Sequence, residues 1–238
     1  MIGRLISLND PLNALHKRHR KMRQAEGIMP ILKTLLAPPL AKGSSELPDL
    51  DILVVDLETS GLDPDRDQIL SIGMVTIHQL KIPLSSARHC FLLNPSSVRA
   101  ESAVINHITP EQLDAGLTLA QALEQFVEQA RGKLLLAHGA AIENTFLAQA
   151  FGVKSLPLVW LDTMMIEKSL SHNRGNVLGN YTLSHVREHY GLPSYTAHNA
   201  LSDAIATAEL FLAQVKLIFP DTPPVLAPIY RRSVKATA

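Results

Sequence analysis

The chain has almost no cysteine and no long apolar segment. Its one cysteine, Cys90, excludes an internal disulfide framework and a cysteine-based zinc cluster, and it suits a reducing compartment. No apolar run approaches the roughly 18 residues needed to span a bilayer. The N-terminal stretch MIGRLISLNDPLNALHKRHRKMRQ also lacks the unbroken apolar core of a signal peptide. We therefore expect a cytoplasmic protein without membrane contact.

A net charge of one sign is also absent. The 22 Lys and Arg balance the 22 Asp and Glu, and 46% of the residues are hydrophobic, which indicates a globular chain rather than a disordered one. The charges are unevenly spread, with net +4 in residues 1–50, −6 in 51–220 and +2 in 221–238. An acidic body with basic ends would suit carboxylates gathered around cations and basic segments that meet an anionic partner. Charged side chains that simply lie on solvent-exposed faces of the protein would give the same distribution of charge.

Composition divides the chain into four parts, and we see no internal repeat. We predict a basic helical arm over residues 1–36 and a linker rich in Pro, Gly and Ser over 37–49. The main domain is expected over 50–218. The last part, 219–238, holds four prolines and is predicted to be an extended tail.

The main domain is predicted to be an α/β fold. The apolar, β-branched run at 52–58 is typical of a buried strand, and short connections to strands at 68–77 and 89–95 imply an antiparallel meander. Two further strands, at 133–138 and 156–163, alternate with helices. Helices are expected at 109–131, 142–151, 181–191 and 197–219. The result is a mixed five-stranded sheet, with three antiparallel strands and then two parallel ones, flanked by helices.

Two carboxylates, Asp56 and Glu58, stand near the end of the first strand. Residues two apart in a strand share a face, about 7 Å from each other. Carboxylates placed in this way would repel each other and resist desolvation unless a cation neutralised them. A hard divalent ion such as Mg²⁺ or Mn²⁺ is the natural solution. Because D-x-E is a frequent tripeptide, the alternative that both side chains are simply in water stays open.

The start of the last helix offers another carboxylate. Asp203 lies there, although the helix macrodipole favours an aspartate at a helix start whatever its function. His198, five residues earlier, would bring an imidazole within reach of whatever the carboxylate binds. Asp162 is expected to cap the helix after the fifth strand.

The order of these motifs resembles a known family. VVDLETSGL, LLLAHGAAIENTFL and YTAHNALSDAIATAE are similar, in order and spacing, to the three blocks of the DEDDh 3′–5′ exonucleases, the DnaQ-like branch of the ribonuclease-H-like fold. The resemblance covers about residues 51–215. INHITPEQL, 105–113, also resembles the family segment that follows the third strand. Three blocks in order, ending in H-x4-D, are specific.

The resemblance implies a set of catalytic groups. It makes Asp56, Glu58 and Asp203 metal ligands and His198 the general base. Two Mg²⁺ or Mn²⁺ ions about 3.5–4 Å apart would hold the scissile phosphate, one activating water and the other stabilising the leaving oxygen. An imidazole can take the proton from that water near neutral pH.

The second block departs from the family pattern. The family usually has His-Asn-x-x-Phe-Asp, whereas residues 138–143 read HGAAIE, so the fourth catalytic metal ligand would be Glu143. One extra methylene moves the carboxylate oxygens by about 1.5 Å unless the backbone compensates. Charge and ligand type are kept, and we expect retained catalysis. Without the resemblance, Glu143 reads as a solvated helix residue.

The resemblance also implies a substrate, the 3′ end of a nucleic acid. Thr59 and Leu62 match positions that bind the terminal nucleoside, with Leu62 as an apolar wedge under the base, and His138 is expected to contact substrate. We expect single-stranded DNA ends to be favoured and nucleoside 5′-monophosphates to be released, in DNA repair or replication. An exoribonuclease with the same site and a catalytically weak binding module are the alternatives, since a 2′-hydroxyl is a small difference.

The basic arm is expected to contact nucleic acid or a protein partner. Its cluster at 16–23 reads HKRHRKMR. The arm before the first block and the short tail after the domain differ from the usual replicative proofreading subunit, so we do not expect that form.

Overall fold

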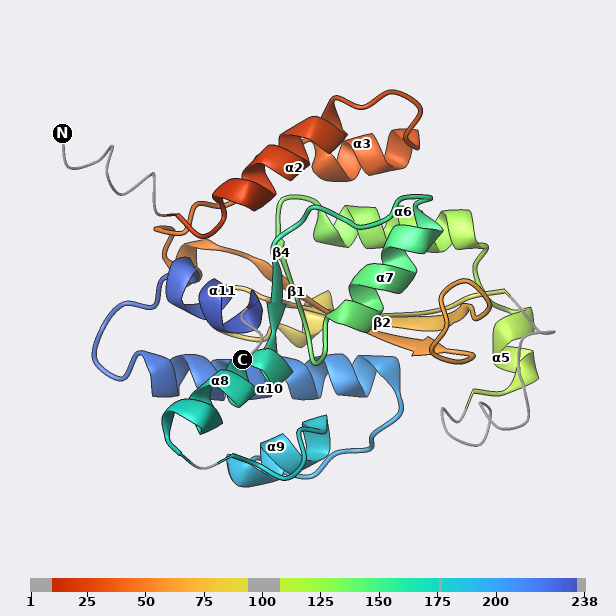
Figure 1. The fold of residues 1–238 in the computed structure, drawn as a ribbon. Coiled ribbons are helices and arrows are strands. Elements are labelled where there is room, and N and C mark those ends of the chain that lie inside the picture. Colours follow the sequence, from red (N-terminus) through yellow and green to blue (C-terminus); the bar gives the residue numbers. More distant parts are fainter. Residues whose placement is uncertain (1–9, 94–107, 176, 235–238) are drawn as a thin grey trace.

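The protein is built on a single mixed sheet (Figure 1). The computed structural model describes residues 10–93, 108–175 and 177–234. The sheet has the order β3-β2-β1-β4-β5, and its strands are β1 (Ile52–Thr59), β2 (Ile69–Ile77), β3 (Arg88–Phe91), β4 (Leu134–Ala137) and β5 (Trp160–Asp162). The first three strands pair antiparallel, and β4 and β5 join in parallel. This confirms the predicted strand arrangement.

Helices cover both faces of the sheet, as Figure 1 shows. They are α2 (Asn13–Arg23), α3 (Pro30–Leu36), α5 (Pro110–Asp114), α6 (Leu119–Ala130), α7 (Ala141–Ala150), α8 (Thr163–Asn173), α9 (Leu183–His189), α10 (Ala200–Ile218) and α11 (Leu226–Val234). Short 3₁₀ turns lie at Leu47–Asp49 and Leu84–Ser86. Within the described ranges, no helix combines the length and apolarity that crossing a membrane requires.

The central strand β1 is buried on both faces. Leu53 and Val55 pack with α3, α6 and α7, whereas Ile52 and Val54 pack with α8, α10 and α11. Because side chains alternate along a strand, a nearly continuous apolar run is the sequence that such a position requires.

A glycine brings α10 close to the sheet. Gly73 in β2 pairs with Asp56 of β1. A Cβ atom built on Gly73 would lie 2.1 Å from the backbone carbon and oxygen of Ala200, the first residue of α10. Only glycine permits this approach, and it places the first turn of α10 directly over the end of β1.

The predicted helical arm is helical in its described part, and it is packed into the body. Leu15 of α2 is 8% exposed, and Leu32, Leu35 and Leu36 of α3 are at most 2% exposed, in the apolar clusters on either side of the sheet. The helices of the arm therefore belong to the core of the described molecule.

The segment predicted as a linker, 37–49, is also fixed to the body. Leu47 is fully buried, and its backbone N–H donates to the Pro224 carbonyl oxygen over 2.8 Å. The N–H of Gly43 donates to the Asp10 carboxylate over 2.9 Å.

The prediction of an extended C-terminal tail is wrong for residues 226–234, which form α11. Pro223 and Pro224 precede this helix and Pro228 lies in its first turn, where a missing N–H disrupts no helical hydrogen bond. Leu226 and Ile229 are fully buried, and α11 packs against α8 and β5.

The single helix predicted over 109–131 is also wrong, because two helices form there. Thr109 caps α5 and Thr118 caps α6, each in a capping box with a glutamine three residues later. Leu117, between them, bridges to Leu92 beyond the end of β3. The start of the family-like segment at 105–113 lies outside the described residues.

Candidate active site

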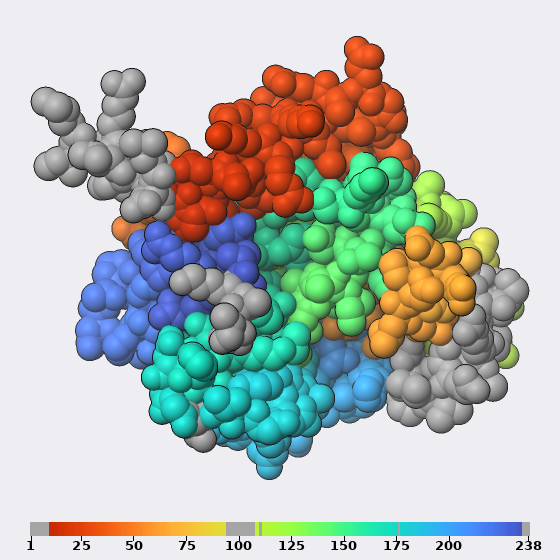
Figure 2. All heavy atoms as spheres, in the orientation of Figure 1, coloured from red at the N-terminus to blue at the C-terminus, as the bar shows by residue number. Residues whose placement is uncertain are grey.

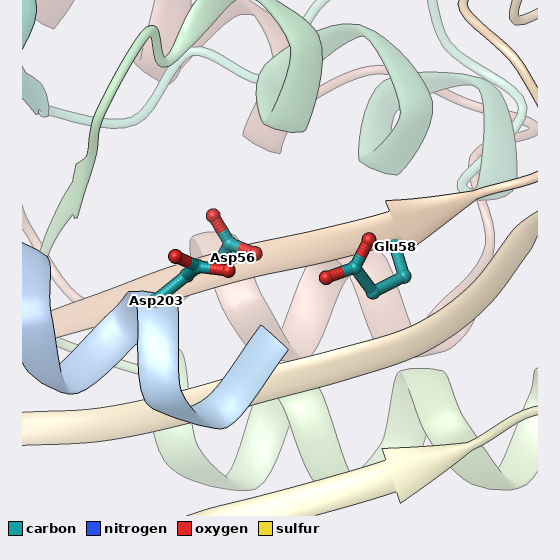
Figure 3. Close-up of side chains that lie close together, drawn as sticks. All are labelled: Asp56, Glu58 and Asp203. Atoms are coloured by element: carbon teal, nitrogen blue, oxygen red, sulfur yellow. The ribbon is translucent and has the colours of Figure 1, made fainter. Parts of the chain in front are cut away.

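Three carboxylates converge where β1 meets α10 (Figure 3). Asp56 and Glu58 come from the last part of β1, and Asp203 comes from the first turn of α10. One carboxylate oxygen from each residue lies within 4.8 Å of the others. The structure thus brings together residues that are some 145 positions apart in the chain.

These carboxylates are not simply in water. Glu58 is 8% exposed, and burial, followed by the charge of Asp203, raises its pKa to about 7. Burial also raises the pKa of Asp56 well above its usual range, and the charges of Glu143, Asp203 and Glu58 add to this effect. Such a group of oxygens holds protons unless a cation replaces them, so the donor set fits a hard divalent ion.

Glu143 is not part of the set of oxygens that lie within 4.8 Å of one another, but its charge acts on Asp56. Glu143 lies in the first turn of α7 and is 5% exposed, so the interpretation as a solvated helix residue is wrong. Its Oε2 atom is buried with no hydrogen-bond partner among the described residues. Burial raises the pKa of Glu143 to about 8, and the charge of Asp162 contributes. A buried carboxylate oxygen without a partner needs an explanation, and a nearby cation would supply one.

Asp162 holds the loop that presents Glu143. Its carboxylate accepts hydrogen bonds from the N–H groups of Gly139 and Ala140, both over 3.0 Å, just before α7. It also accepts from Met164 and Met165, which confirms the predicted cap of α8. The sequence indicated that Asp162 caps α8, but it gave no sign of the hydrogen bonds from Gly139 and Ala140 to the same carboxylate.

His198 lies on the turn immediately before α10, and its side chain is exposed. Its φ of +63° is in the left-handed region, which is uncommon for a residue other than glycine and is often found at functional sites. The next residue, Asn199, caps α10 by accepting from Ser202 N, and its own N–H donates to Asp203 Oδ2 over 3.2 Å. The turn that carries His198 is therefore hydrogen-bonded to Asp203, the candidate metal ligand on α10.

A buried arginine fastens the segment that leads to this turn to α10. Arg187 of α9 is 3% exposed and donates to the carbonyl oxygens of Ala206 (2.6 Å) and Pro193 (2.9 Å). It also pairs with Glu209 over 2.8 Å, and its guanidinium lies 5.0 Å from the ring centre of Tyr195. Sequence reasoning missed Arg187, because its helical position gives no sign of burial.

Tyr195 was missed as well, although it stands three residues before His198 in the third block. Burial raises the pKa of its phenol, and the adjacent Asp203 carboxylate adds to that shift. Its position in the quoted block was the only available signal.

The three predicted substrate-binding residues have different surroundings. Leu62 is 78% exposed on the turn after β1, and Thr59 Oγ1 donates to the Gly61 carbonyl oxygen over 2.6 Å. The ring nitrogens of His138 contact Thr163 Oγ1 at 2.8 Å and the Tyr181 carbonyl oxygen at 2.7 Å. Both nitrogens are thus engaged within the protein.

The sequence matches known proteins across the region that carries this site. The exonuclease family model matches residues 53–211. The DNA polymerase III PolC-type protein of Thermotoga petrophila is 31% identical over 178 residues, which are 73% of this chain and 12% of that protein. The DNA polymerase III subunit epsilon of Treponema pallidum is 30% identical over 164 residues, which are 67% of this chain and 74% of that protein. The chain thus spans only about an eighth of the PolC-type relatives.

Solved structures share the fold. Exonuclease I of E. coli in complex with a dA16 oligonucleotide has a TM-score of 0.62 at 15% identity, over 72% of this chain and 42% of that one. Exonuclease X in complex with 5′ overhanging duplex DNA has a TM-score of 0.57 at 19% identity, over 75% and 99%. The match over residues 53–211 and the epsilon relative show that this chain belongs to the exonuclease family, in its DnaQ-like 3′–5′ branch.

Proposed function

We propose that the chain removes nucleotides stepwise from the 3′ end of a nucleic acid, with DNA favoured, and releases nucleoside 5′-monophosphates. The observation that carries this proposal is the convergence of Asp56, Glu58 and Asp203, with the charge of the buried Glu143 acting on Asp56. Burial raises the pKa values of Asp56, Glu58 and Glu143, so their charged forms would be destabilising without cations, and phosphodiester hydrolysis is a reaction that needs cations there.

Asp56, Glu58, Asp203 and Glu143 would hold two Mg²⁺ or Mn²⁺ ions. When bound, such ions lower the pKa of water and stabilise the leaving oxygen. The remaining steps fall to the side chains of the chain itself.

His198 takes the proton of the attacking water in this proposal. Its turn is held by the hydrogen bonds of Asn199 with Asp203 and Ser202, so the imidazole can approach the substrate phosphate without a large loss of conformational entropy. Its place on the surface also lets the proton pass to solvent.

The turn after β1 receives the terminal nucleoside. Leu62 would stack under the base, since 78% of its surface is uncovered, and the hydrogen bond from Thr59 to Gly61 holds the turn that carries it. We assign His138 a positioning role, because both ring nitrogens bind other parts of the chain.

DNA is the favoured substrate, in replication or repair. Support comes from the matched relatives, which are named DNA polymerase III, and from the two structural neighbours described as complexes with DNA or an oligonucleotide. The acidic site itself would contact a sugar and a phosphate, and RNA has both of these groups as well.

The decisive test follows a 5′-labelled single strand over time with Mg²⁺ or Mn²⁺ present. The wild type should give a ladder that shortens from the 3′ end. Asp56→Asn removes one ligand charge and should lower the rate about 100- to 1000-fold, equivalent to roughly 3–4 kcal/mol of transition-state stabilisation. Asp221→Asn, the same change at an exposed position, should match the wild type.

An intact labelled strand with the wild type, or equal rates for Asp56→Asn and the wild type, would overturn the proposal. A matched RNA oligomer in the same assay distinguishes the exoribonuclease alternative, which requires RNA to be degraded faster than DNA. Binding without any metal-dependent turnover would identify a binding module instead.

A further inference from the structure

Helix α2 presents a basic face to solvent. Its eleven residues carry five Lys and Arg and no acidic residue. Leu15, His19 and the partly buried Met22 lie on the side that packs against the body. At 3.6 residues per turn, Lys17 and Lys21 fall on the opposite side, and both side chains are exposed.

Two arginines at the flanks of this face fasten the helix. The Arg18 guanidinium donates to Ser155 Oγ over 2.8 Å, and that of Arg23 donates to the Ala37 carbonyl oxygen over 3.2 Å. The outward residues Lys17, Arg20 and Lys21 form no salt bridge within the described ranges. Their positive charge is therefore available to a partner, in a protein whose central part, residues 51–220, is net negative.

The helix α7 connects this face with the active centre. Its first turn holds Glu143, and the loop after its far end holds Ser155, the contact of Arg18. Ten helical residues span about 15 Å. Figure 2 shows α2, in red, and α7, in green, on the same side of the molecule. At about 3.4 Å per phosphate along one stacked strand, the length of α7 alone corresponds to about four or five nucleotides.

We infer that the face formed by Lys17, Arg20 and Lys21 binds the sugar-phosphate backbone of the substrate strand, several nucleotides before the 3′ end that enters the active site. The inference rests on the proposed function. The large apolar side chains of α2 are turned to the body, so the face offers cations but no apolar stripe. Cations alone suit a polyanion, whereas a protein interface would add large apolar or aromatic anchors.

The first test measures affinity for a 20-nucleotide single strand as a function of salt. All proteins carry Asp56→Asn, so that the strand is not degraded. Lys17→Gln/Lys21→Gln should reduce the slope of log affinity against log salt by about 1.4, at roughly 0.7 per lost phosphate contact. Between 50 and 200 mM salt, the parent would then lose about sevenfold more affinity than the variant.

The matched control is Lys81→Gln/Lys216→Gln. It removes the same charge at two exposed lysines on other elements, the turn after β2 and the end of α10. Its slope should equal that of the parent. Equal slopes for the two double variants would overturn the inference, because net charge alone would then account for the salt effect.

The second test compares substrate lengths in proteins with Asp56 intact. Lys17→Gln/Lys21→Gln should lower kcat/KM about three- to tenfold for the 20-nucleotide strand and leave hydrolysis of a dinucleotide unchanged, since a dinucleotide cannot reach α2. An equal loss on both substrates would contradict the inference. A wild type that binds the long strand but hydrolyses neither substrate would instead refute the proposed function.

Discussion

At the residue scale, Glu143 stands where the family pattern has an aspartate. It carries the same charge on a side chain that is one methylene longer. The side chain is almost fully buried, its Oε2 is unpaired among the described residues, and its charge contributes to the raised pKa of Asp56. A purely structural glutamate would be expected to have hydrogen-bond partners for both oxygens. The position therefore favours a catalytic carboxylate over a helix surface residue.

Replacing Glu143 tests this role. Glu143→Gln keeps the size but removes the charge, and we expect kcat/KM to fall about 100-fold, or roughly 2.7 kcal/mol. Glu143→Asp restores the family residue and should stay within about tenfold of the wild type. Stopped-time digestion of a labelled single strand measures both, with Glu128→Gln on the exposed side of α6 as the control. Full activity in Glu143→Gln would show that Glu143 has no catalytic role.

At the element scale, the contact between β2 and α10 decides where Asp203 lies. The backbone of Gly73 touches that of Ala200, and the register pairs Gly73 with Asp56. Any side chain at this position would separate the helix from the strand. The geometry of the acidic cluster thus depends on a residue that has no functional group.

Gly73→Ala should disturb stability and the site together. A Cβ 2.1 Å from backbone atoms forces α10 to move, and overpacking of this kind costs about 1–3 kcal/mol. We expect a lower urea midpoint and weaker Mn²⁺ binding by calorimetry. Gly179→Ala is the control, because nothing lies within 4 Å of a Cβ there, and it should change stability by less than about 0.5 kcal/mol. Unchanged Mn²⁺ affinity in Gly73→Ala would show that the cluster tolerates a displaced helix.

The same scale shows where sequence patterns were sufficient and where they failed. The five strands and α10 follow from apolar runs and periodicity, which record burial directly. The break between α5 and α6 depends on the pairing of Leu117 with Leu92, a contact between distant segments. In α11, the prolines favour an extended chain, but the buried Leu226 and Ile229 decide the conformation.

At the scale of the whole molecule, the acidic cluster links stability to pH. In the metal-free protein, the pKa is about 7 for Glu58 and about 8 for Glu143, against 4.5 for an ordinary glutamate, and that of Asp56 is also raised. The folded state then binds more protons than the unfolded state. The stability that these groups contribute is complete below about pH 4.5 and is lost as pH rises through 7 and 8.

We therefore expect the free energy of unfolding to fall between pH 7 and pH 8.5 in EDTA. Mn²⁺ should remove most of this fall, because it binds the ionised carboxylates. Urea denaturation at both pH values, with and without Mn²⁺, measures the effect. His19, which is buried, and His89 and His138, which are half-buried, have pKa values lowered from 6.5 by desolvation, so they are already neutral in this range.

Glu58→Gln removes one of the titrating groups and should make the fall in EDTA smaller. A pH dependence that is identical in the wild type and in Glu58→Gln would mean that Glu58 does not titrate in this window.

The arm is another feature of the whole molecule. Because Leu32, Leu35 and Leu36 are part of the core, deletion of the arm would remove buried apolar surface and lower stability. Surface substitutions on α2 separate its charge from its packing, which a deletion cannot do.

The sequence alone determined the strand arrangement and the family, and it singled out Asp56, Glu58 and Asp203, which the fold brings together, because these are local patterns in a fixed order. The role of His198 stays a prediction. The tertiary structure alone decided that Glu143 is buried beside Asp56, that Asp162 and Arg187 hold the loops of the site, and that the arm and α11 belong to the core. The physical reason is that the burial of these side chains and their hydrogen bonds depend on contacts between segments far apart in the chain. A single sequence does not show which distant segments meet.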